Sequence, residues 1–90
     1  MLGEERCLKL KELIFLENFS YNSWDSLAYN EDERNLLHAI RNALVYIHER
    51  KKVTPFIKKL LMEAIEELKK EEHCDVAEIL GNLLNEFSED

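Results

Sequence analysis

Two arginines and two histidines recur along one predicted helix with a spacing that places them in a single row. At about 100° per residue, positions i, i+4, i+7 and i+14 share one sector of a helix, beside the apolar stripe that faces the core. Arginine offers paired N–H donors that suit phosphate, and histidine exchanges protons near neutral pH. The row could therefore bind a phosphate, although we favour the simpler interpretation of a polar flank that pairs with nearby glutamates. Its members are Arg34, His38, Arg41 and His48.

Part of this row resembles a ribonuclease signature. Arg41 and Asn42, followed by His48, resemble the R-x4–6-H motif of the HEPN ribonucleases. In that family the arginine and the histidine line a cleft, usually across a dimer, and cleave RNA without a metal ion. The resemblance implies an alternative function, a metal-independent ribonuclease or RNA-binding protein that uses Arg41 and His48. The chain departs from the family pattern because the motif lies in the second predicted helix, not near the end of a longer bundle.

Aromatic residues are concentrated in one segment. Five of the eight fall within the fifteen positions from Phe15 to Tyr29. Tyrosine and tryptophan are favoured residues at protein interfaces, and they also suit the open end of a small bundle, which they can plug. We expect mainly a plug, and we predict that a contact with a partner or a second copy would use the same side chains. The predicted interface residues are Phe19, Tyr21, Trp24 and Tyr29.

The cysteines and their neighbours give no metal signature. His73, Cys74 and Asp75 are consecutive, whereas structural zinc usually needs C-x2–4-C spacing, and Asp75 is better explained as a helix cap. In an up-and-down bundle Cys7 and Cys74 lie at opposite ends, whereas a disulfide needs Cα atoms within about 7 Å. We therefore predict two free thiols, no metal and no cofactor.

The formal net charge is −7, and its distribution restricts the partner. Residues 75–90 carry five acidic side chains and no lysine or arginine, whereas 31–52 is the only net-positive segment. An acidic surface repels phosphates, so we expect no nucleic acid partner. The acidic end suits solubility. A third function class would use it to imitate nucleic acid and bind a DNA- or RNA-binding protein.

Charged side chains also determine the expected location. Residues 2–16 contain six of them, which excludes a secretory signal peptide. The longest apolar run in this segment is Leu13 to Leu16, far short of the ~20 residues that span a bilayer. With two free thiols, which suit a reducing compartment, these features predict a cytoplasmic protein without membrane contact.

Helix-start signals define the expected fold. A cap residue precedes an apolar run of helical period at three places, and one of these has proline at the first helical position. The signals are Asn30 with Glu33, Thr54 with Pro55, and Asp75 with Glu78. With a first helix from about residue 4 to 18, they predict helices over 31–51, 55–71 and 76–87.

The connections between the later helices are short, which makes successive helices antiparallel neighbours. The predicted fold class is all-α, a small up-and-down antiparallel bundle of four helices, in a single domain over 1–90. Because no catalytic motif is present, we expect a small acidic protein-interaction or regulatory module. It would bind a protein partner or a second copy of itself, and it would have no catalytic activity.

Overall fold

The computed structural model describes residues 3–71 and 74–87. Within them the chain forms five α-helices and no strand. The all-α class is confirmed, and the helix count exceeds the predicted four because part of the aromatic segment forms a short helix of its own. The helices are α1 (Glu4–Phe15), α2 (Tyr21–Asp25), α3 (Glu31–Arg50), α4 (Pro55–Leu68) and α5 (Val76–Phe87).

The predicted helix starts match the observed ones. The Asn30 side chain accepts a hydrogen bond from the Glu33 N–H at 2.9 Å, which caps α3. Thr54 Oγ1 accepts from the Ile57 N–H at 3.2 Å, and Pro55 occupies the first turn of α4. The third signal is followed by α5, which begins at Val76. Local capping chemistry therefore determines where α3 and α4 begin.

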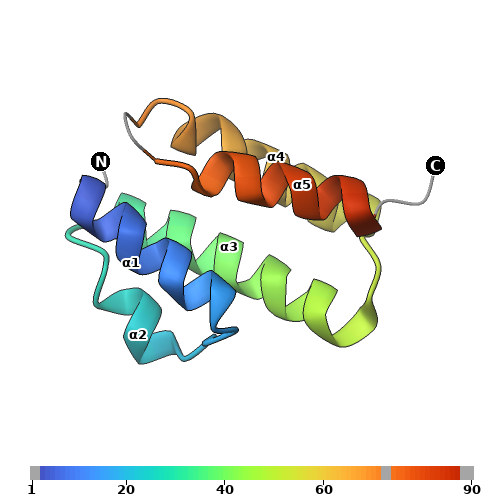
Figure 1. The fold of residues 1–90 in the computed structure, drawn as a ribbon, viewed down its shortest axis with the longest axis horizontal. Helices are drawn as coiled ribbons and strands as arrows, with labels where there is room; N and C mark the ends of the chain where they lie inside the picture. The colour runs from blue at the N-terminus through green and yellow to red at the C-terminus, as the bar shows by residue number, and fades with distance from the viewer. Residues whose placement is uncertain (1–2, 72–73, 88–90) are drawn as a thin grey trace.

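The helices alternate in direction only over the second part of the chain. Figure 1 shows that α3, α4 and α5 run antiparallel in succession, as predicted. In contrast, α1 runs in the same direction as α3, because α2 and its flanking turns carry the chain back before α3 begins. The simple up-and-down order is therefore wrong for the first connection.

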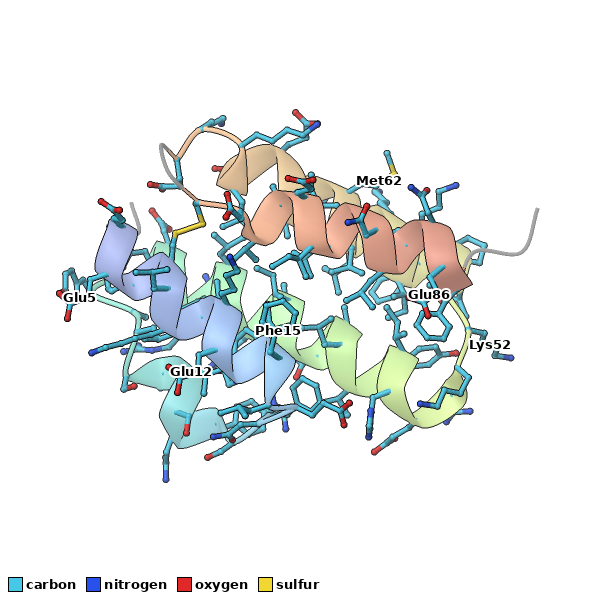
Figure 2. The ribbon with its side chains drawn as sticks, viewed as in Figure 1. Glu5, Glu12, Phe15, Lys52, Met62 and Glu86 are labelled. Atoms are coloured by element: carbon cyan, nitrogen blue, oxygen red, sulfur yellow. A yellow bond between two sulfur atoms is a disulfide. The ribbon has the colours of Figure 1, made fainter. Side chains whose placement is uncertain are left out.

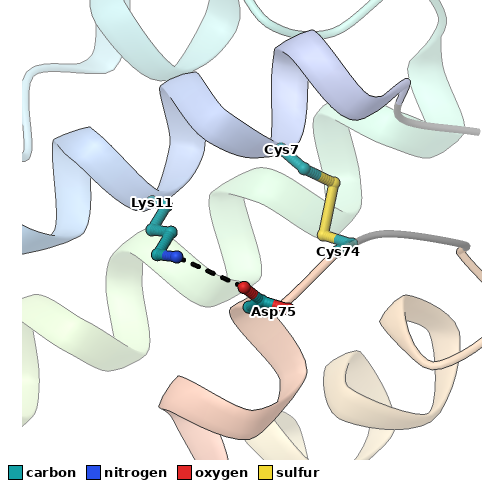
Figure 3. The surroundings of a disulfide bond; sticks show 4 residues. All are labelled: Cys7, Lys11, Cys74 and Asp75. Atoms are coloured by element: carbon teal, nitrogen blue, oxygen red, sulfur yellow. Dashed lines mark hydrogen bonds and ion pairs between the residues drawn. A yellow bond between two sulfur atoms is a disulfide. The ribbon is translucent and has the colours of Figure 1, made fainter.

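This reversal corrects the prediction of two free thiols. Cys7 and Cys74 form a disulfide with their Cα atoms 5.6 Å apart. Because α1 and α5 start at the same end of the molecule, the first turn of α1 lies beside the residue that precedes α5 (Figures 2 and 3). Lys11 and Asp75 form an ion pair at 3.3 Å next to the disulfide. The cytoplasmic prediction consequently loses the support of free thiols, since disulfides persist mainly in oxidising compartments.

The core is built from aliphatic side chains of all the long helices together with one aromatic residue from α2. The fully buried side chains include Trp24, Leu10, Leu37, Ile40, Leu61, Leu68 and Leu80. This matches the apolar stripes predicted for the later helices. No helix in the described part of the chain is long and apolar enough to cross a membrane.

Candidate functional site

The first half of the Arg/His row is occupied by an acidic residue of α2. His38 Nε2 lies 2.5 Å from Asp25 Oδ1, and Arg34 Nε lies 3.7 Å from the same oxygen. The ring of Tyr21 meets the His38 imidazole edge-on at 5.3 Å. Asp25 therefore takes the place in which a phosphate would have to bind.

Arg41 is also held by the aromatic segment. Its Nε donates to the Phe19 carbonyl at 2.7 Å, and its Nη1 donates to Asn42 Oδ1 at 2.8 Å. Its guanidinium stacks on the Tyr21 ring at 3.8 Å, and the Tyr21 hydroxyl donates to the same Asn42 oxygen at 3.2 Å. Arginine stacked and hydrogen-bonded in this way stabilises the α2–α3 contact.

His48, at the end of the row, has different surroundings. Its Nδ1 lies 3.5 Å from Glu17 Oε2, and its ring lies 5.9 Å from that of Phe19. His48 lines a surface groove that Arg41 does not line. The two residues of the ribonuclease-like motif therefore do not share one cleft in this chain, and the geometry does not favour that alternative.

The four predicted interface residues separate into two groups. Trp24 is fully buried, and its Nε1 donates to the Asn18 carbonyl at 2.7 Å, which removes it from any surface. Phe19 is half-buried and packs beside Trp24 at 6.5 Å between ring centroids. Tyr21 and Tyr29 are 50% and 78% exposed. Of these four residues, Trp24 and Phe19 therefore plug the bundle, and Tyr21 and Tyr29 remain exposed at the surface.

A buried ion pair joins α1 to the start of α3, and the sequence analysis did not identify it. Arg6 Nη1 and Nη2 donate to Glu33 Oε1 and Oε2 at 2.6 and 3.2 Å, and the Tyr29 N–H donates to Oε1 at 2.7 Å. The Arg6 guanidinium lowers the pKa of Glu33 to about 2, against an ordinary 4.5. Arg6 also stacks on the exposed Tyr29 ring at 3.6 Å. The pair holds α1 against the start of α3. The feature of the sequence that pointed to Glu33 was its place in the capping pattern with Asn30.

An apolar groove of about 300 Å³ lies where α1 ends. The 12-residue α1 stops far short of the 20-residue α3, so the second halves of α3 and α5 extend beyond it (Figure 1). Glu17 has a left-handed φ of 55°, and the Asn18 N–H donates to the Leu13 carbonyl at 3.0 Å, which terminates α1. The early end of α1 therefore leaves one side of α3 uncovered.

Apolar side chains line this groove, and charged residues also contribute to its lining. Figure 2 shows Phe15 at the end of α1 and Glu86 towards the end of α5. The charged residues are Glu17, Lys51 and Glu86, and His48 lies beside them. The apolar lining consists of Ile14, Phe15, Phe19, Leu44, Ile47, Ile79, Leu83 and Phe87. Sequence analysis missed the groove, although Phe15 was one of the aromatic residues it singled out.

Residues that bind metals do not gather elsewhere in the described segments. No group of three or more histidine, cysteine, aspartate or glutamate side chains there could hold a metal ion. Of the consecutive His73, Cys74 and Asp75, His73 lies outside the described residues, and Cys74 is bonded to Cys7.

Comparison with protein-family models, with curated proteins and with solved structures finds no match to this chain. Function must therefore be argued from the groove itself.

Proposed function

We propose that this chain is a protein-interaction module without catalytic activity, and that it binds its partner through the apolar groove at the end of α1. The observation that carries the proposal is the exposure of Phe15 and Leu16, each 67% accessible, at the edge of a groove lined by further apolar side chains. Contiguous exposed apolar surface on a small protein marks an interaction site.

The distribution of polar and apolar groups supports the same function. An interface typically has an apolar centre and a polar rim, and the groove combines eight apolar residues with four polar or charged ones. Its volume of about 300 Å³ is at the lower end of ligand pockets, and a few large side chains would fill it. A helix face or loop of another protein therefore suits the groove.

The other function classes have less support. In the ribonuclease alternative, Arg41 and His48 would act together, whereas Arg41 contacts Phe19 and Tyr21 and His48 contacts Glu17. An acidic imitation of nucleic acid would use the five acidic residues of 75–90. Two of them lie outside the described residues, and a third, Asp75, is already paired with Lys11. No observation favours either class over the groove.

The cytoplasmic location remains part of the proposal. The Cys7–Cys74 disulfide is more typical of an oxidising compartment, so the location needs a test of its own. Alkylating thiols inside intact cells before lysis tests the location. Modified cysteines in the recovered protein would support the cytoplasm, whereas bridged cysteines would indicate an oxidising compartment.

Photo-crosslinking from the groove tests the function. A photoreactive phenylalanine analogue is placed at Phe15, and in a matched control at Phe56, an exposed aromatic on α4 that lines none of the described cavities around that helix. We expect one predominant protein conjugate from position 15 that the added substitution Leu16→Glu abolishes. Equal or absent conjugation from the two positions would refute the proposal.

A further inference from the structure

We infer that the partner in the groove is a second copy of this chain, related by a two-fold axis. Phe15 and Leu16 of each protomer pack against the groove of the other. Lys51 of each protomer pairs with Glu86 of the other. The inference rests on the proposed function and names its partner. It is drawn from the charges of the groove and from the apolar side chains beside it.

The charges of the groove are self-complementary. Glu17 and His48 already lie 3.5 Å apart and satisfy one another. Lys51, directly after α3, and Glu86 on α5 are exposed, and neither forms an ion pair with another described residue. A rim of one sign would select a partner of the opposite charge. One unpaired cation and one unpaired anion instead suit a copy of the same surface. A two-fold axis places the Lys51 of each protomer beside the Glu86 of the other, which forms two ion pairs.

The apolar contact is self-complementary in the same way. An isologous dimer needs one patch that offers both the protruding group and the surface that receives it. Phe15 lines the groove while remaining 67% exposed, and Leu16 follows it with the same exposure. The half-buried Leu83 and Phe87 of α5 form the opposite wall. Each copy would therefore bury the two exposed side chains of the other.

Exposed apolar residues also lie on α4. Phe56 and Met62 are exposed there, and Met62, but not Phe56, lines the two cavities beside that helix together with Lys58 and Glu66. This face thus supplies a control position of similar exposure.

Sedimentation equilibrium over a range of protein concentrations measures the assembly directly. We expect wild type to reach twice the chain mass of 10.7 kDa. Phe15→Glu should raise the dimer dissociation constant about 100-fold, because a buried aromatic at the centre of an interface contributes most of the binding. Phe56→Glu, which introduces the same charge outside the groove, should leave that constant unchanged. A wild type that stays at 10.7 kDa at every concentration would overturn the inference.

Charge reversal tests the two-fold pairing. Lys51→Glu and Glu86→Lys should each weaken their own homodimer about 10-fold, because like charges then meet twice across the axis. An equimolar mixture of the two variants should regain wild-type affinity, since both crossed pairs are again of opposite sign. Lys52→Glu changes the same helix end by the same charge and should have little effect. Failure of the mixture to recover would overturn the pairing across the axis. An ion pair within one chain would give that failure, because mixing two chains cannot restore it.

The crosslinking experiment separates this inference from the proposed function. A conjugate of two identical chains from position 15 supports both. A conjugate with a different protein, together with a monomeric wild type, overturns the homodimer and leaves the interaction module standing. Conjugation no greater than at position 56 overturns both.

Discussion

The first and second halves of α3 differ in how far the rest of the chain covers them. We call the surface along the first half the covered side and the surface along the second half the open side. Along the first half of α3, Asp25 of α2 contacts Arg34 and His38, and the Phe19 carbonyl before α2 accepts from Arg41. Along the second half α1 has ended, and the apolar stripe is left as a groove. The residues best suited to chemistry thus lie where the chain covers itself, and the exposed apolar residues lie where it does not.

This difference separates stability from association. On the covered side each side chain is already satisfied by another part of the chain, so substitutions there should lower the free energy of unfolding. On the open side the exposed groups have few contacts within the chain, so substitutions should affect binding and leave stability near wild type. The following predictions test this division, from the largest effect to the smallest.

The disulfide should make the largest contribution to stability. It closes a loop with a sequence separation of 67 residues, for which the chain-entropy relation gives about 4 kcal/mol. We expect Cys7→Ala/Cys74→Ala, and reduction of wild type, to lower the free energy of unfolding in urea by about this amount. The double variant should not respond further to a reducing agent. Unchanged midpoints after reduction would show that α1 is held by packing alone.

The Arg6–Glu33 pair should make stability depend on pH in the acid range. Folding lowers the pKa of Glu33 from 4.5 to about 2, which corresponds to about 3 kcal/mol. Because the folded pKa is lowered, this contribution is present above pH 4.5 and is lost as the pH falls towards 2.

Urea unfolding between pH 6 and pH 2 measures this loss. Glu33→Gln should be less stable at neutral pH, because it leaves the buried guanidinium without its carboxylate, and it should show a shallower decline in acid. Glu31→Gln, at the exposed first position of α3, should retain the wild-type decline. Parallel curves for wild type and Glu33→Gln would contradict the assignment.

Arg41 and Phe15 provide a direct comparison of the two sides. Arg41→Ala removes the hydrogen bond to the Phe19 carbonyl and the stacking on Tyr21, and should lower stability by about 1–2 kcal/mol. Phe15→Ala should change stability by less than about 0.5 kcal/mol, since its ring is mostly exposed. Thermal and urea unfolding measure both, and sedimentation should show the reverse order for association.

The same variants test the ribonuclease alternative. We expect wild type to leave single-stranded RNA intact. Cleavage by wild type that is lost in both Arg41→Ala and His48→Ala would restore that alternative, and would show that the covered side retains chemistry despite its contacts.

The sequence predicted those parts of the fold that depend on local chemistry. The starts of α3 and α4 follow from Asn30 and Thr54, whose side chains bond to backbone groups three positions away. The direction of α1 relative to α3 depends instead on α2, which lies in the aromatic segment where no helix was predicted. Because α2 reverses the chain, Cys7 meets Cys74, a contact between residues too far apart in sequence for any local pattern to reveal.

The candidate site was predictable only in part. The polar row was correctly placed on one helix, but its partners come from Asp25 and Phe19, whose position depends on how α2 folds back. The groove depends on where α1 ends relative to α3 and α5, which is a property of tertiary arrangement. Phe15, Phe19 and His48 were singled out in advance for other reasons, without their neighbours on α5 across the groove.

Substitution of Gly81 on α5 gives a small predicted effect on stability. It compares the cavity at Gly81 with the groove beside Phe15. Glycine in a helix interior disfavours the helix, and a Cβ added at Gly81 would meet nothing within 4 Å. It lines a second cavity, between α4 and α5, with Met62 and Leu84. Gly81→Ala should therefore stabilise the protein by about 0.5–1 kcal/mol, because alanine favours the helix and meets no steric obstacle.

Differential scanning calorimetry measures this gain, and sedimentation should show an unchanged dimer constant. A loss of stability would mean that α4 and α5 approach each other more closely at Gly81 in solution. A changed dimer constant would mean that this second cavity also takes part in association. If both expectations hold, the hollow at Gly81 reflects only a missing side chain and takes no part in association.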